Sequence, residues 1–265
     1  MPLEPEVFAA AGFRSSGRRF HEMRVFAPQI RTQLASDGSS RLDMGLTKVW
    51  CTVAGPREPI RRGVKSEQTK GASVDVKISI MASSTVDYRK GSRNDKRITE
   101  LESAIRKAFE STIHTHLYPS SQISIQLHVL HQDGSLLAAL INAATLALVD
   151  AGIPMSDYLA ACSAGLVVYH AAGDDRAAAL LDIDKDEEDQ LPYLTVATLG
   201  ASDKVAVLWS DTNVHISRLE TMMACAVDGC AKIREKMDDI VKQHGQRLIS
   251  QGTVERGAEL DVEMD

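Results

Sequence analysis

The chain has 265 residues, of which 44% are hydrophobic, and a formal net charge of −6 at pH 7. This composition is typical of a globular protein with a full hydrophobic core. We expect no membrane association, because no apolar run approaches the roughly 18 residues of a membrane span and the start carries no signal-peptide pattern. Four scattered cysteines lack metal-ligand spacing, so we expect buried reduced thiols, no metal site and no cofactor; they are Cys51, Cys162, Cys225 and Cys230.

The hydrophobic pattern predicts strands and helices in mixed order. Alternating apolar residues predict strands at 24–30, 48–53, 74–80, 123–129, 164–169, 194–199 and 205–208. Helical spacing predicts helices at 96–116, from 136 to about 152, and at 216–249. Segments 56–71, 83–95 and 182–189 are expected to be polar loops. The pattern favours an α+β fold forming a single compact domain over residues 1–250, followed by an acidic, disordered tail at 251–265.

The basic residues gather in two of these loops although the chain as a whole is acidic. Five basic residues stand against two acidic ones in 57–70, and five against one in 89–97. The net charge excludes indiscriminate nucleic-acid binding, but local basic patches indicate a restricted path for a polyanion. On charge alone, solvated loops without a ligand are an equally good interpretation.

The segment 126–155 carries the clearest functional signal. A strand runs into the turn Asp133-Gly134-Ser135, which opens directly onto a helix. Backbone N–H groups at a helix start, after a glycine that permits close approach, form an anion site. Ser135 is placed to cap this helix and to contact a phosphate. The next residue is Leu136, where a phosphate site would be expected to have arginine.

These and other segments resemble the RNase PH family, and more narrowly the ring subunit of the eukaryotic RNA exosome core that descends from the catalytic archaeal type. The resemblance covers about the first 250 residues. Its segments are Gly17-Arg18-Arg19, Asp37-Gly38-Ser39, 55–59 (GPREP), Lys96-Arg97, and Asp133-Gly134-Ser135 through Met155. It implies an RNase PH-type fold of mixed β-sheets with packed helices.

The resemblance also assigns roles to residues. It implies that Lys96 and Arg97 bind the RNA backbone and phosphate. The family's Ser/Thr-Arg pair, which holds the attacking phosphate, is here Ser135-Leu136, so with Gly134 the phosphate site is expected to be vestigial. A leucine donates no hydrogen bond, and charge-assisted hydrogen bonds contribute roughly 1.5–3 kcal/mol each.

The family's acidic element shows a second departure. Asp189 matches the first acid of that element, but Tyr193 stands where the family has a second aspartate. Because loss of a positioned general acid costs about 10²–10⁴ in rate, we expect a vestigial acid site and a chain that is not an enzyme. A pore loop is expected to contact RNA through Arg61, Arg62, Lys65 and Ser66.

The expected function is therefore a non-catalytic exosome ring subunit that scaffolds the core and lines the channel threading single-stranded RNA for 3′→5′ processing and degradation. Expected partners are other RNase PH-like ring subunits, RNA-binding cap subunits and a hydrolytic exoribonuclease. The expected location is the nucleus, including the nucleolus, and the cytoplasm. One alternative is an active phosphate-dependent 3′→5′ exoribonuclease that uses Lys96, Arg97, Ser135 and Asp189. Another is a small-molecule phosphate-binding enzyme, for which one glycine turn is weak evidence.

Overall fold

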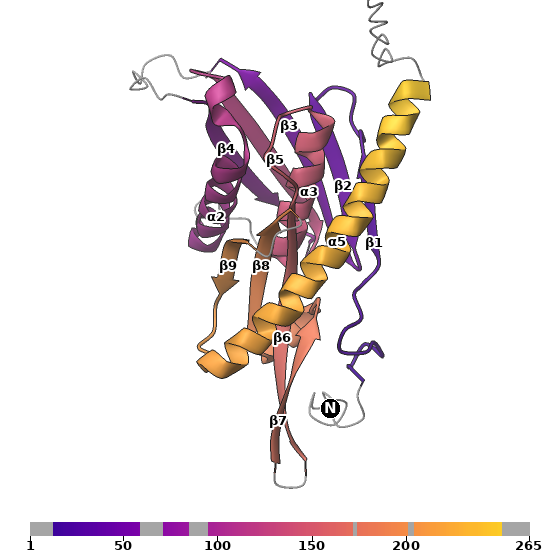
Figure 1. Cartoon of the computed structure of the whole chain (residues 1–265), viewed down its shortest axis with the longest axis vertical. Coiled ribbons are helices and arrows are strands. Elements are labelled where there is room, and N and C mark those ends of the chain that lie inside the picture. Colours follow the sequence, from indigo (N-terminus) through magenta and orange to yellow (C-terminus); the bar gives the residue numbers. More distant parts are fainter. Residues whose placement is uncertain (1–12, 59–70, 85–94, 172–173, 201–203, 251–265) are drawn as a thin grey trace, which may run out of the picture.

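The computed structural model describes residues 13–58, 71–84, 95–171, 174–200 and 204–250 (Figure 1). The predicted pore-loop residues (Arg61, Arg62, Lys65 and Ser66) and the acidic tail lie outside the described residues. Their roles remain predictions, as does the division into one domain and a tail. No helix in the described part of the chain has the length and apolar character needed to cross a membrane.

The first sheet has five strands in the order β1-β2-β3-β5-β4. Neighbouring strands are antiparallel, except that β4 runs parallel to β5. The strands are β1 (Phe26–Ile30), β2 (Gly38–Met44), β3 (Thr47–Arg57), β4 (Ser73–Ile80) and β5 (Gln122–His131).

The second sheet has four antiparallel strands in the order β7-β6-β8-β9. The strands are β6 (Leu159–Ala171), β7 (Asp174–Leu181), β8 (Tyr193–Leu199) and β9 (Val205–Ser210). The helices are α2 (Lys96–Thr112), the short 3₁₀ helix η1 (Thr115–Leu117), α3 (Leu136–Asp150), α4 (Lys185–Gln190) and α5 (Ile216–Ser250).

Helix α3 joins the two sheets into one body. All of its residues from Leu136 to Leu148 are buried, and it contacts β2 and β3 of the first sheet and β6 and β8 of the second. Its polar side chains form hydrogen bonds with the backbone of β6. The Asn142 amide exchanges two 2.8 Å hydrogen bonds with the backbone of Ala161, and Thr145 Oγ1 donates to the Leu159 carbonyl. A fully buried helix therefore has partners for its polar side chains.

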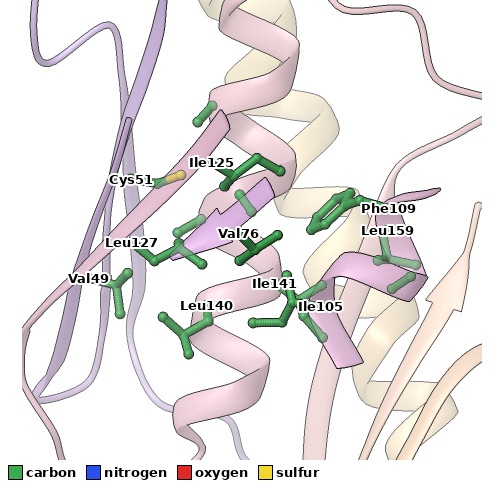
Figure 2. Packing of buried hydrophobic residues seen from close by; sticks show 14 of the residues in the cluster. Val49, Cys51, Val76, Ile105, Phe109, Ile125, Leu127, Leu140, Ile141 and Leu159 are labelled. Atoms are coloured by element: carbon green, nitrogen blue, oxygen red, sulfur yellow. The ribbon is translucent and has the colours of Figure 1, made fainter. Parts of the chain in front are cut away.

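The main hydrophobic core lies between α3, α2 and the first sheet (Figure 2). Alternate residues of β3 and β5, such as Val49, Cys51, Ile125 and Leu127, point into it, as the period of two along a strand requires. Phe109 of α2 is a fully buried member of the same core. A smaller cluster on the other side of β6 packs against α5, which runs beside β1 in Figure 1.

The predicted α+β class and RNase PH-type fold are confirmed, but three elements were missed. Strand β2 contains turn-forming Gly38-Ser39-Ser40, yet both serines are buried because their hydroxyls donate to the Gln33 and Ala143 carbonyls. Strand β7 begins with acidic residues, and the six-residue α4 is too short for a period to show. Strand β3 also continues past Gly55-Pro56, where the sequence predicts its end.

Candidate functional site

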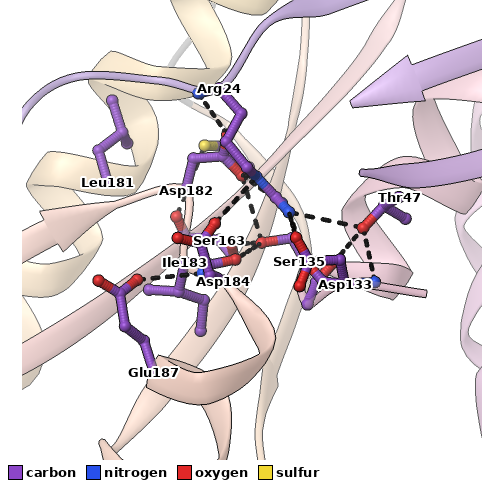
Figure 3. Close-up of polar contacts among 12 residues, drawn as sticks. Arg24, Thr47, Asp133, Ser135, Ser163, Leu181, Asp182, Ile183, Asp184 and Glu187 are labelled. Atoms are coloured by element: carbon purple, nitrogen blue, oxygen red, sulfur yellow. Dashed lines mark hydrogen bonds and ion pairs between the residues drawn. The ribbon is translucent and has the colours of Figure 1, made fainter. Parts of the chain in front are cut away.

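A buried ion pair supports the turn at the start of α3 (Figure 3). The Arg24 guanidinium lies 2.7 Å from Asp182 Oδ1, and the Arg24 backbone N–H donates to Asp182 Oδ2 at 2.9 Å. Arg24 also donates to the Asp133 carbonyl, and Thr47 Oγ1 donates to the Gly134 carbonyl at 2.9 Å. The turn is therefore held by charged and hydroxyl groups from β3, from the residue after β7 and from the segment before β1.

A second buried ion pair, between Arg14 and Glu187, holds the segment from the end of β7 into α4. Arg14 binds both carboxylate oxygens of Glu187 and the carbonyls of Leu181 and Asp182. Burial raises the pKa of Asp182 and of Glu187, but their paired arginines outweigh it, and the net effect lowers both pKa values below their ordinary range. The prediction of an acidic surface loop over 182–189 is wrong, because two of its acids are buried and paired and α4 forms within it.

The predicted helix-capping role of Ser135 is wrong. Ser135 adopts a left-handed backbone conformation, and its side chain makes no capping hydrogen bond. The hydroxyl, which is 3% exposed, instead donates to the Ile183 carbonyl at 2.9 Å and contacts the Ser163 hydroxyl. Ser135 therefore ties α3 to β6 and to the segment before α4.

Gly134 permits a close approach, as predicted, but the approaching group belongs to the chain itself. Its φ is +73°, and a Cβ there would lie 2.6 to 2.8 Å from backbone atoms of Ile183, Asp184 and Lys185. Since no side chain fits at that distance, glycine is needed for the turn to lie against the start of α4. This contact brings the acidic segment beside α3.

The packing brings residues from separate predicted motifs into one cavity of about 490 Å³. Five residues singled out from the sequence line it: Arg97, Ser135, Leu136, Asp189 and Tyr193. They come from the starts of α2, α3 and β8 and from α4. Lys96 is exposed at the start of α2 but is not among the lining residues.

The wall of the cavity also contains a carboxylate that the sequence reasoning missed. Tyr193 Oη donates a hydrogen bond to Asp211 Oδ2 at 3.1 Å, and Arg97 Nη2 lies 3.5 Å from the same oxygen. Partial burial, followed by the carboxylates of Glu188 and Asp211, raises the pKa of Tyr193. The tyrosine therefore stays a neutral hydrogen-bond donor at physiological pH.

The cavity retains charged groups of both signs. Arg97 and Lys185 are cationic, and Lys185 Nζ pairs with Asp189 Oδ1 at 2.5 Å. The acidic residues that line it are Asp95, Glu100, Glu188, Asp189 and Asp211. Among the described residues, no group of three or more His, Cys, Asp or Glu is arranged to hold a metal ion. Carboxylates therefore outnumber cations in this lining, five to two.

Comparison with known proteins identifies the family. A family model described as the 3′ exoribonuclease family, domain 1, matches residues 22–154, and the domain 2 model matches residues 157–229. The chain belongs to this 3′ exoribonuclease family. The two matched parts meet at the cavity, because Arg97 and Leu136 lie in the first and Asp189 and Tyr193 in the second.

Several characterised relatives are exosome components. The chain is 40% identical over 246 residues to the exosome complex component ski6 of Schizosaccharomyces pombe, covering 92% of this chain and 97% of the relative. It is 34% identical to SKI6 of Saccharomyces cerevisiae (92% and 96% covered) and 35% identical to human RRP41 (90% and 94% covered). The predicted resemblance to this exosome subunit is confirmed.

Two solved structures share the fold. Rice Rrp46 superposes with a TM-score of 0.74 at 24% identity, covering 86% of this chain and all of the other. A chain of the Archaeoglobus fulgidus exosome with RNA bound to the active site superposes with a TM-score of 0.71 at 19% identity, covering 87% and 94%.

The expectation that the chain is not an enzyme is wrong. The two family models that match it are those of 3′ exoribonucleases, and together they cover the residues on both sides of the cavity. The expectation rested on Leu136 and Tyr193 alone. It did not take into account that the folded cavity keeps two cations and gains the carboxylate of Asp211 from the end of β9.

Proposed function

We propose that the protein is a ring subunit of an RNA exosome, and that its 490 Å³ cavity receives the 3′ end of single-stranded RNA for phosphate-dependent 3′→5′ degradation. The observation that carries the proposal is the convergence of Arg97, Ser135, Leu136, Asp189 and Tyr193 on one cavity. These residues come from three motifs far apart in the sequence. The exosome relatives, which match over about nine-tenths of the chain, support the assembly.

Each group at the cavity has a role in this proposal. Arg97 neutralises a backbone phosphate of the RNA, and Lys96, exposed one residue earlier, holds the preceding part of the strand. The Glu188 Oε2 atom is buried without a hydrogen-bond partner among the described residues. It is a fitting acceptor for a ribose hydroxyl, because a buried acceptor without a partner destabilises the protein.

The reaction requires inorganic phosphate to attack the terminal phosphodiester. A P–O bond forms to the attacking phosphate, the P–O bond to the 3′ oxygen breaks, and a nucleoside diphosphate leaves while that oxygen takes a proton. Asp189, protonated and released from its pair with Lys185, is the acid in this proposal. The backbone N–H groups at the start of α3 hold the attacking phosphate, Arg97 holds the phosphate of the RNA, and Tyr193 contributes a neutral hydrogen bond.

The remaining parts of the assembly belong to the same proposal. RNA would reach the cavity through a channel completed by neighbouring ring subunits, with Arg61, Arg62, Lys65 and Ser66 at its pore. RNA-binding cap subunits and an associated hydrolytic exoribonuclease would complete the complex. Nuclear, nucleolar and cytoplasmic pools, and a role in rRNA processing, follow from the same assembly.

The test is a nuclease assay on the full chain assembled with its ring partners. A single-stranded RNA labelled at its internal phosphates is incubated with magnesium, with and without inorganic phosphate, so that any released nucleoside diphosphate carries the label. We expect nucleoside diphosphates only with phosphate, and a loss of about 10²-fold or more in Asp189→Asn, as for removal of a general acid. Asp239→Asn, an exposed acid on α5, makes the same charge change away from the cavity and is the control. Bound RNA without any phosphate-dependent product would refute the catalytic part.

A further inference from the structure

A second cavity, of about 850 Å³, lies where the C-terminal half of α5 passes the β1 edge of the first sheet. Residues of β1, β2, β3 and β5 form one side, and residues 240–247 of α5 form the other. None of its lining residues belongs to the 490 Å³ cavity. The volume lies within the range of roughly 300–1,000 Å³ that small-molecule and cofactor sites occupy.

This second cavity is positively charged although the chain is acidic. Arg31, Arg41 and Arg247 line it, and no aspartate or glutamate is among its described lining residues; the lining residue His244 lies 3.4 Å from Asp150 Oδ1. Arg41 is already paired with Asp43 at 3.1 Å. The side chains of Arg31 and Arg247 make no ion pair or hydrogen bond within the described part of the chain, so both guanidinium groups are free to bind an anion.

The cavity also contains a fixed aromatic ring. Trp50 lies opposite Arg41 in the β2–β3 register, and its indole N–H donates to Thr32 Oγ1 at 3.2 Å. The hydrogen bond holds the edge of the indole, and the ring is only partly buried. Leu130 adds an apolar group beside it. A held indole next to unpaired arginines suits a planar base attached to a phosphate, because bases stack on aromatic rings irrespective of sequence.

We propose that this cavity binds a nucleoside phosphate, with the base stacked on Trp50 and the phosphate held by Arg31 and Arg247. The ligand is either a free nucleotide or one unit of a single-stranded RNA. The site is separate from the proposed 3′-end cavity and does not depend on catalysis there. It gives the subunit a second nucleotide contact, on the side of the first sheet where α5 meets β1.

The two tryptophans allow a direct test, because Trp50 lines this cavity and Trp209 lines the other. In the full-length Trp209→Phe variant, Trp50 is the only fluorescent indole. Titration with ADP is expected to quench its fluorescence in a saturable manner, and adenosine is expected to bind at least about tenfold more weakly, since it lacks the phosphate. A short oligoadenylate that binds more tightly than ADP identifies RNA as the ligand, and the opposite order identifies a free nucleotide.

Charge-reversal variants distinguish ADP binding at this site from a general electrostatic attraction of ADP to the protein. Arg31→Glu with Arg247→Glu, in the Trp209→Phe background, is expected to weaken ADP binding at least about tenfold. The matched control is Arg106→Glu with Lys107→Glu, two exposed residues of α2 outside both cavities that give the same change in net charge. Circular dichroism verifies that both doubles are folded.

Two outcomes overturn the proposal. One is the absence of saturable Trp50 quenching by both ADP and oligoadenylate at millimolar concentration. The other is an equal loss of ADP affinity in the Arg31/Arg247 double variant and in the Arg106/Lys107 control variant. Neither outcome bears on the 3′-end site, because phosphate-dependent nuclease activity is measured with Trp50 and both arginines intact.

Discussion

Arg97 Nη2 lies 3.5 Å from Asp211 Oδ2, so the arginine that the sequence assigns to RNA faces a carboxylate of its own chain. The same oxygen accepts the hydrogen bond from Tyr193. Asp211 therefore links the end of β9 to both α2 and β8 at the cavity wall. An RNA phosphate bound to Arg97 has to compete with this carboxylate.

Asp211→Asn is expected to tighten single-stranded RNA binding by up to about fivefold. The ion pair is largely exposed, and such pairs contribute at most about 1 kcal/mol, which sets the limit. Fluorescence anisotropy of labelled RNA with the assembled ring measures the effect. Asp239→Asn removes one negative charge elsewhere and should change affinity much less. Unchanged or weaker binding in Asp211→Asn would show that the carboxylate does not compete for Arg97.

Arg24→Met is expected to destabilise the protein by about 3–5 kcal/mol, because it leaves Asp182 buried, charged and without its main partner. Chemical denaturation followed by circular dichroism measures the free energy of unfolding. Arg41→Met is the matched control, since its pair with Asp43 is partly exposed and should contribute at most about 1 kcal/mol. Equal losses in the two variants would contradict the assigned role of the buried pair.

The stability of the fold is expected to decrease under acid conditions. Asp182 and Glu187 have ordinary pKa values of 3.8 and 4.5, and both are lowered in the folded state. Their stabilisation is therefore complete above the ordinary values and is lost as the pH falls through the lowered ones. Urea denaturation between pH 7 and pH 3 should show a falling free energy of unfolding below about pH 4.5.

The contribution of Glu187 to the loss of stability at low pH can be measured by mutation. Glu187→Gln should flatten the fall in unfolding free energy below pH 4.5, because it removes one group whose pKa differs between the two states. Glu220→Gln, an exposed acid on α5, should leave the slope unchanged. A wild-type slope in Glu187→Gln would mean that the Arg14 pair does not contribute to it.

Gly134→Ala is expected to be more destabilising than Gly152→Ala. Both glycines have positive φ, at +73° and +67°, so each alanine incurs roughly 1–2 kcal/mol of backbone strain. Only at Gly134 would the new Cβ meet backbone atoms within 2.8 Å, while nothing lies within 4 Å at Gly152. Thermal and urea denaturation measure the loss in free energy of unfolding for each variant. Equal losses would show that the close approach to α4 does not require glycine at position 134.

Local sequence patterns were enough to predict the class of fold and the motifs at the cavity. Period-two alternation in β4 and β5 and the fully apolar α3 are local patterns, so they indicate their elements without knowledge of neighbours. The resemblance selected Arg97, Ser135, Asp189 and Tyr193, and all four line one cavity.

The contacts of the polar residues depend on how distant parts of the chain pack together. Arg24 and Asp182 lie 158 positions apart, and nothing in the local pattern of either predicts their buried pair. The hydroxyl of Ser135 binds Ser163 and Ile183 instead of its own helix because the chain from β7 to α4 passes beside it. Asp211 reaches Tyr193 because β9 pairs with β8. Long-range contacts of this kind are set by packing of complete elements, whereas periodicity reports only on the residues within one element.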